Sequence, residues 1–213
     1  KEKTCLILRE VLLKMAVNRE PILKRCRYLG ISPAVMGVSK KESIRFKNAN
    51  NRKKISEYGM QLKEKQKLKF IYGVLEKPFY HYFEIASKME GKTGDNLITC
   101  LESRLDSVVF RMGLALTRRE ARQLVVHNHY TVNGKKVNIP SYRVKVGDVI
   151  ALAEKDKTSE KFKSTVEATK DRVVPMWLNA NKDSFSATVV RMPSTEDIDY
   201  EVAAHLIVEL YSK

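Results

Sequence analysis

The chain has 213 residues, 43% hydrophobic and 31% charged, which is typical of a folded globular protein and excludes wholesale disorder. Forty lysines and arginines against 25 acidic residues give a net charge of +15. A polyanion matches this charge best, because each phosphate contact releases condensed counterions. An anionic membrane surface or acidic proteins match it less well. No apolar run approaches a membrane span and no signal peptide is visible, so we expect no membrane partner.

The positive charge is concentrated in the first two-thirds of the chain. Residues 1–100 carry a net +12, residues 101–150 a net +5, and residues 151–213 a net −2. We therefore expect the anion-binding surface in the first two segments, and scaffold or protein-contact surface in the third.

The N-terminal part contains few strong signals of secondary structure. Met15 begins a segment that resembles a natural protein start, so residues 1–14 are either an upstream in-frame extension or a genuine amphipathic one. A short helix is predicted over residues 18–27, ended by Gly30. Residues 37–57 are rich in Lys, Arg and Asn and predict a loop or extended arm that orders on a partner.

A second helical signal begins near Gln61. An approximate apolar stripe runs through Leu62, Gln66, Phe70, Val74 and Phe79, with Lys63, Lys65, Lys67 and Lys69 beside it. Two interpretations stay open. The lysines are either a solvated face of a docked helix or a basic surface along RNA backbone, and the +12 balance favours the second.

The segment from residue 101 to residue 152 has the strongest pattern. Apolar residues at helical spacing predict a helix over residues 101–112, which Gly113 ends. Thr117 and Glu120 fit a capping box, so a second helix should run from Arg118 to about His127.

Rotation of about 100° per residue separates the two faces of this second helix. It places Arg118, Arg119, Arg122 and Gln123 together, opposite the apolar residues, and arginine is well suited to gripping phosphates or stacking on unpaired bases. Asn133-Gly134 then predicts a tight hairpin whose tip carries Lys135 and Lys136, and Gly147-Asp148 predicts a second tight turn, between residues 144–146 and 149–152.

These residues carry a family resemblance. The segments 104–106, 117–125 and 132–135 resemble the S4-type RNA-binding domain. Residues 66–76 and the terminal 205–213 extend the likeness to the bacterial small-subunit ribosomal protein S4 family, over essentially all of residues 15–213.

The resemblance implies an α+β fold and a function. It implies a mostly helical N-terminal domain completed by the C-terminal segment, with an inserted module of two helices on a small antiparallel sheet. The expected boundaries are 15–100, 101–165 and 166–213. The family function is that of a structural constituent of the small ribosomal subunit, which binds rRNA early and nucleates assembly of the subunit body. It also implies an influence on translational accuracy and contacts with neighbouring ribosomal proteins and with mRNA where it enters the subunit.

The sequence departs from the family pattern at two places. Many relatives carry a four-cysteine zinc knuckle, whereas here only Cys26 lies in the matching segment, so we expect the zinc-free variant with no cofactor. Asn128 stands where glycine is common, although asparagine tolerates a left-handed backbone. The three cysteines (Cys5, Cys26, Cys100) form no CxxC pair, which predicts a reduced, cytoplasmic protein. The family resemblance implies a location in the bacterial ribosome rather than in an organellar one.

Catalytic and metal-binding alternatives are weaker. Gly91-Lys92-Thr93 lacks the earlier glycine of a phosphate-binding loop, since that position is Ala86. Two histidines, His127 and His129, rarely hold a metal alone. Glu102 and Asp106 could imitate an acid–base pair, but an ion-paired role, for example with Arg104 or a facing arginine, fits better. Trp177 is expected to be a packing anchor where the chain returns to the helical domain.

We therefore expect no enzyme. The alternative is a stand-alone S4-domain RNA-binding or RNA-modifying protein, but RNA-modifying relatives of the module need a separate catalytic domain that neither flank supplies. The candidate rRNA-binding residues are Lys24, Arg25, Arg27, Arg52, Lys53, Lys54, Lys63, Lys67, Lys69, Arg104, Arg111, Arg118, Arg119, Arg122, Gln123, His127, Asn133, Lys135 and Lys136.

Overall fold

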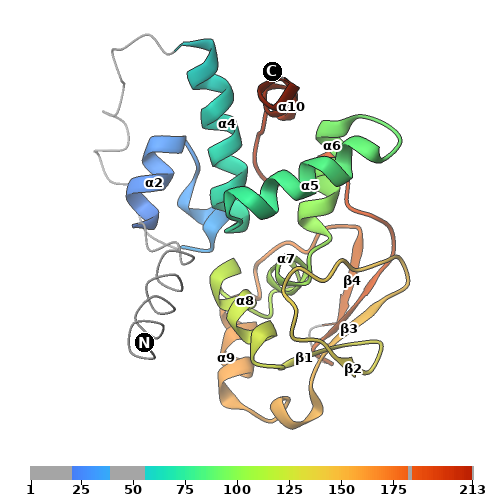
Figure 1. Ribbon diagram of the computed structural model, residues 1–213. Helices are drawn as coiled ribbons and strands as arrows, with labels where there is room; N and C mark the ends of the chain where they lie inside the picture. Colours follow the sequence, from blue (N-terminus) through green and yellow to red (C-terminus); the bar gives the residue numbers. More distant parts are fainter. Residues whose placement is uncertain (1–20, 39–55, 182–183, 213) are drawn as a thin grey trace, which may run out of the picture.

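The computed structural model describes residues 21–38, 56–181 and 184–212. Helices and one antiparallel sheet form two adjoining bodies, a helical body and a module that contains the sheet (Figure 1). The expected α+β fold is confirmed. No helix in the described ranges is long and apolar enough to cross a membrane.

The helical body combines N-terminal and C-terminal parts of the chain. Its elements are α2 (Ile22–Leu29), η1 (Pro33–Met36), α4 (Glu57–Tyr72), α5 (Glu76–Lys88), α6 (Thr93–Glu102) and α10 (Ala204–Ser212). Its core includes Leu68, Ile71, Phe79, Leu101 and, from the last helix, Ile207, which are all fully buried. Helix α10 packs against α4 and α6, so the C-terminal segment does return to this body (Figure 1).

Local sequence signals determine where these helices begin and end. Ser56 caps α4 by accepting a hydrogen bond from the backbone N–H of Gly59. Gly73, with a positive φ of 62°, ends α4 in the left-handed conformation. The expected continuous stripe from Leu62 to Phe79 is therefore wrong, because the chain turns at Gly73 and starts α5.

The helix expected over residues 101–112 is also divided. Helix α6 ends at Glu102, and α7 (Leu105–Arg111) starts in a new direction after Arg104, whose backbone is extended. Arg104 forms an isolated β-bridge with Arg143, and the N–H of Leu105 donates to the carbonyl of Tyr142. This long-range pairing with the backbone interrupts a segment whose apolar spacing alone suits one helix.

The module begins with α7 and α8 (Arg118–Val126). Its strands are β1 (Tyr130–Val132), β2 (Lys135–Lys136), β3 (Val149–Leu152), β4 (Leu178–Asn181) and β5 (Ser186–Val189), and α9 (Glu160–Ala168) and the short η2 (Glu154–Asp156) lie between β3 and β4. The five strands have the order β2-β1-β3-β5-β4 and are antiparallel throughout. The predicted hairpin is confirmed, because Asn133 and Gly134 both have positive φ between β1 and β2.

The last two strands correct the expected domain boundary at residue 165. Residues 178–189 are expected from the sequence in the segment that returns to the helical body, yet β5 pairs with β3 and β4 pairs with β5. Trp177 is a buried packing anchor, as expected, but in the core of the module. The second tight turn is present, since the Asp148 N–H donates to the Lys145 carbonyl, although residues 144–146 form no strand.

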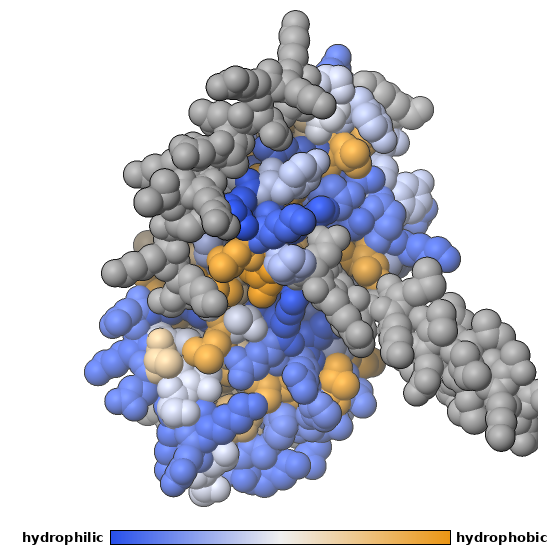
Figure 2. Space-filling model, turned by 90° about the vertical axis from the view of Figure 1, so that its left-hand side faces the viewer, coloured by the Kyte–Doolittle hydropathy of each residue, from blue (hydrophilic) through white to orange (hydrophobic). Residues whose placement is uncertain are grey.

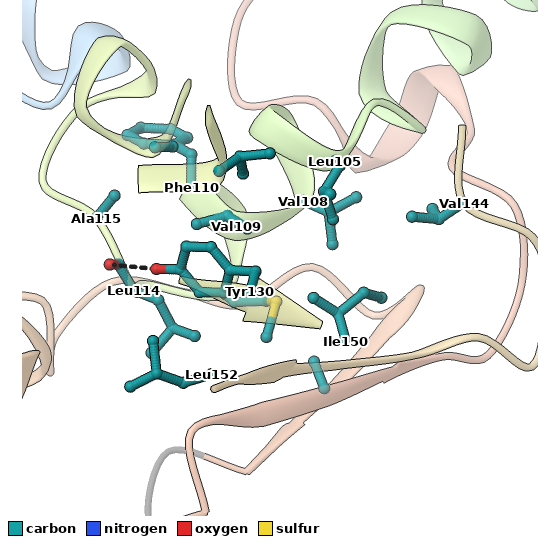
Figure 3. Close-up of a cluster of buried hydrophobic side chains, with 14 of the residues drawn as sticks. Leu105, Val108, Val109, Phe110, Leu114, Ala115, Tyr130, Val144, Ile150 and Leu152 are labelled. Atoms are coloured by element: carbon teal, nitrogen blue, oxygen red, sulfur yellow. Dashed lines mark hydrogen bonds between the residues drawn. The ribbon is translucent and has the colours of Figure 1, made fainter. Parts of the chain in front are cut away.

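The core of the module lies between α7 and the sheet (Figure 3). Leu105 and Val108 of α7 lie over Ile150 of β3, and Val109 lies over Tyr130 of β1. Leu105, Val108, Val109 and Ile150 are all completely buried. Tyr130 is also completely buried, and its hydroxyl donates to the Leu114 carbonyl at 3.1 Å. A buried tyrosine hydroxyl needs such a partner, so this bond joins β1 to the loop before α8.

Candidate nucleic-acid interface

Helix α8 presents the clearest exposed basic face of the module. Thr117 caps it by accepting a hydrogen bond from the Glu120 N–H at 3.2 Å. The Glu120 carboxylate accepts from Leu116 rather than from Thr117, so the capping box is only half formed. Along the helix, Arg119, Arg122, Gln123 and His127 are exposed. These side chains are therefore accessible to a ligand, and Arg122 is held in place by Asp106, whose carboxylate lies 3.9 Å from its Nη1.

Arg118 was expected on the same face, but it is only 6% exposed. Its guanidinium lies between the rings of Phe110 and Tyr72, 4.4 and 5.2 Å from their centroids, and donates to the Val35 carbonyl. The expectation is corrected for a physical reason. The helical rotation located the core of the module correctly but ignored the second body, which covers the start of α8.

Arg111 is also inside the protein and not on an RNA-binding surface. Its Nε and Nη2 donate to the two carboxylate oxygens of Glu102, at 3.2 and 2.7 Å, and its Nη1 donates to Asp199 at 2.9 Å. Tyr72 donates to the same Glu102 at 2.7 Å and contacts the hydroxyl of Tyr200. Burial opposes ionisation of Glu102, but the arginines outweigh it and lower its pKa. This ion-pair network connects α4, α6 and α7 with the chain before α10.

Arg104 forms a second buried pair. Its guanidinium donates to both oxygens of Asp106 and, through Nη1, to the Tyr82 hydroxyl at 2.8 Å. Arg104 and Asp106 are each 3% exposed, so Arg104 cannot reach RNA without unfolding the site. The expected ion-paired role of Glu102 and Asp106 is confirmed, and the sequence-based assignment of Arg104 to the RNA surface is corrected.

A groove of about 550 Å³ separates α8 from the turn between α4 and α5. Arg119, Arg122 and Gln123 line one side, and Val126 continues that side as an apolar residue that is 49% exposed. The opposite wall is apolar and contains Phe70, Ile71, Val74, Leu75 and Pro78. This wall could not be predicted from the sequence, where the one local signal for it is Val126, an apolar residue on the polar face of the predicted helix.

The hairpin adds two exposed lysines. Lys135 and Lys136 are exposed on β2. Asn133 is exposed as well, but its side-chain amide already donates to Asp148 and accepts from the Val149 N–H, at 2.8 and 2.9 Å. Asn133 therefore anchors the hairpin to β3, and the lysines are the better candidates for phosphate contact.

The expected basic residues of the helical body differ in how available they are. Lys24 is exposed on α2, whereas Arg25, Arg27 and Lys63 are half-buried. Lys67 pairs with Glu64. Lys65 and Lys69 both pair with Glu76. Burial disfavours the charge of Glu76, but hydrogen bonds from Lys69, Lys65 and Tyr211 lower its pKa to about 2. The candidates Arg52, Lys53 and Lys54 lie outside the described residues.

Figure 2 shows the side of the molecule that lies on the left of Figure 1. There the surface is mainly hydrophilic, and hydrophobic areas are small and separate.

His129 forms a hydrogen-bonded pair with Asp156 at 2.9 Å and packs edge-on against Phe162, so it is a structural residue of the module. Asn128 has the positive φ of 62° that was expected of it. Within the described ranges, no group of three or more His, Cys, Asp or Glu could hold a metal ion.

The fold and this basic surface define a protein built around an S4 domain. The family model described as "S4 domain" matches residues 103–150, and the model "Ribosomal protein S4/S9 N-terminal domain" matches residues 3–102. The junction between the two matches falls at the break between α6 and α7, where the two bodies meet.

Similar proteins extend over nearly the whole chain. Small ribosomal subunit protein uS4 of Lachnospira eligens is 56% identical over 199 residues, which is 93% of this chain and 100% of that protein. The uS4 proteins of Agathobacter rectalis and Fusobacterium nucleatum are 55% and 49% identical with the same coverage. This chain belongs to the uS4 family of small ribosomal subunit proteins, and the resemblance drawn from the sequence is confirmed.

Proposed function

We propose that this chain is a structural constituent of the small ribosomal subunit and binds the rRNA of that subunit. The observation that carries the proposal is the exposed basic face of α8, with Arg119 and Arg122 at the edge of the groove between the two bodies. Arginine can hold phosphates in bidentate fashion and stack on bases, and the apolar wall opposite can receive an unstacked base. The net charge of +15 favours such a polyanionic partner.

The finer parts of the proposal follow the family. The chain binds rRNA as a primary protein, nucleates assembly of the subunit body, contributes to translational accuracy and lies near the path of incoming mRNA. Its other partners are neighbouring ribosomal proteins, and its location is the ribosome of the bacterial cytoplasm. We propose no enzymatic activity, because the two carboxylates that could imitate an acid–base pair are held by buried arginines. We also propose no cofactor, as expected of a zinc-free member of the family.

The test is binding to small-subunit rRNA at several salt concentrations, with an unrelated RNA of equal length as control. We expect specific binding with a steep salt dependence. Arg119→Ala combined with Arg122→Ala should weaken binding and make the slope of log K against log salt shallower by about 0.7–0.9 for each lost phosphate contact.

A matched control comes from α9. Lys163 is exposed on that helix and Lys155 is exposed on η2 before it, so Lys155→Ala with Lys163→Ala removes the same charge from a different surface. Lys161 is left in place, because it lies 4.0 Å from Glu120 of α8. The control variant should retain the slope of the original protein. Equal affinity for both RNAs would contradict specific rRNA binding, and an unchanged slope in the arginine variant would move the contact surface away from α8.

A further inference from the structure

Tyr28 is an aromatic residue of α2 that belongs to neither hydrophobic core. It is 61% exposed, whereas Cys26 and Leu29 beside it are buried in the helical body. A hollow of about 360 Å³ lies next to it, lined by Tyr28, Arg25, Lys24 and Pro21. Packing of the core therefore does not explain this tyrosine, and its surroundings are basic.

The tyrosine ring and a guanidinium are already arranged for stacking. The Cζ atom of Arg25 lies 5.6 Å from the centroid of the Tyr28 ring, within the range of a cation–π contact. Arg25 also reaches across to α4, where its Nη2 donates to Gln66 at 3.4 Å. Arg25 and Tyr28 are both held on α2, which packs against α4. A ligand that stacks on them therefore costs little additional side-chain entropy.

The charges around the ring select the chemistry of the ligand. Lys24 lies four residues before Tyr28, and Arg25 lies three residues before it. Lys24 and Arg25 are therefore on the same side of the helix as the ring. A flat, π-faced group with an adjacent anionic group fits this arrangement, and an unpaired nucleobase with its phosphate has both properties.

We propose that Tyr28, with Arg25 and Lys24, forms a stacking site for one unpaired base of the RNA. The site rests on the proposed function, because it supposes that RNA is the ligand. It lies on α2 in the helical body and is separate from the arginine face of α8 in the module. RNA binding then combines the arginine face of α8 in the module with a stacking contact on α2 in the helical body.

The two kinds of contact respond differently to salt, which makes the proposal testable. Loss of stacking lowers affinity without releasing fewer counterions, whereas loss of a phosphate contact changes the salt slope. Tyr28→Leu should reduce affinity for small-subunit rRNA about 5- to 150-fold at unchanged slope, which is the range of one aromatic–base stack. Tyr28→Phe retains the ring and should bind like the original protein.

Two further variants control the measurement. Lys24→Ala should make the slope shallower, by about 0.7–0.9 if it contacts one phosphate. Tyr80 on α5 is 47% exposed and packs edge-on against Tyr211, so Tyr80→Leu removes an exposed tyrosine of similar type and should leave affinity unchanged. Circular dichroism of each variant shows whether helix content is retained, as expected at such exposed positions.

A fluorescent base analogue gives a direct readout. RNA with 2-aminopurine at each unpaired adenine in turn should contain one position whose fluorescence is quenched by the original protein and by Tyr28→Phe but not by Tyr28→Leu.

If the original protein does not prefer rRNA, the proposed function fails. If it prefers rRNA and Tyr28→Leu binds equally well, or loses affinity with a shallower slope, the stacking site is overturned while the proposed function stands.

Discussion

Replacing Glu102 by glutamine tests how much the buried ion-pair network stabilises the fold. Glu102 is 2% exposed and accepts hydrogen bonds from Arg111 and Tyr72. Glutamine fills the same volume, but it removes the negative charge and turns one acceptor into a donor. Removing one partner of a buried pair costs about 3–5 kcal/mol. Because Arg111 keeps its contact with Asp199, we expect a loss near the lower limit, about 3 kcal/mol.

Urea unfolding at neutral pH measures this loss as a change in the midpoint at constant slope. Glu76→Gln is the matched control. Its pairs with Lys65 and Lys69 are partly exposed, so its loss should be at most about 1 kcal/mol. Equal losses in the two variants would refute the reasoning, since burial would then have no effect on the strength of an ion pair.

The pH dependence of the same difference is a second check. The pKa of Glu102 is lowered in the folded state from its ordinary value of 4.5. Its contribution to stability is therefore fully present above that value and is lost as the pH falls through the folded pKa. The difference between the original protein and Glu102→Gln should be constant from neutral pH to about pH 5.5 and shrink below about pH 4.5. A difference that stays constant in acid would contradict the assignment of the effect to this carboxylate.

Three further substitutions test the packing of the module, each by urea unfolding. Tyr130→Phe removes the hydroxyl that donates to the Leu114 carbonyl and should cost about 1–3 kcal/mol, because it leaves a buried acceptor without this partner. Gly37→Ala should cost more than the roughly 1–2 kcal/mol of a left-handed residue alone, since the added Cβ would lie 1.9 Å from the Leu116 carbonyl oxygen. Trp177→Ala should cost about 3–5 kcal/mol and perturb the sheet, because Trp177 lies in the core of the module. A structural perturbation confined to the helical body would contradict that position.

Elements stabilised by short-range interactions could be predicted from the sequence. The start of helix α8 can be predicted because Thr117 caps the backbone N–H of Glu120, only three residues later. The hairpin can be predicted because Asn133 and Gly134 both suit a positive φ. The exposed residues Arg119 and Arg122 were found by the same means, since the helical period alone separates them from the core of the module. In each case the information lies within one turn of helix or one loop.

Elements that depend on distant partners could not be predicted. Strand β5 is a strand because it pairs with β3, about 37 residues earlier, and no local pattern distinguishes it from an irregular segment. The break between α6 and α7 depends on the bridge from Arg104 to Arg143. Burial of Arg118 depends on Val35 and Tyr72, which belong to the other body. A helical period shows which side of a helix faces its own core but not what covers the opposite side.

Arginine has two opposite uses in this protein, and the distinction changes how its charge should be interpreted. Arg104 and Arg111 are paired with buried carboxylates, and Arg118 is enclosed between two aromatic rings, so none of the three is available to phosphate. Their burial instead positions the module against the helical body, and this fixes the exposed arginines of α8 relative to α2. A count of cations therefore overestimates the number of phosphate contacts. The geometry of the RNA surface depends on buried charges that never touch RNA.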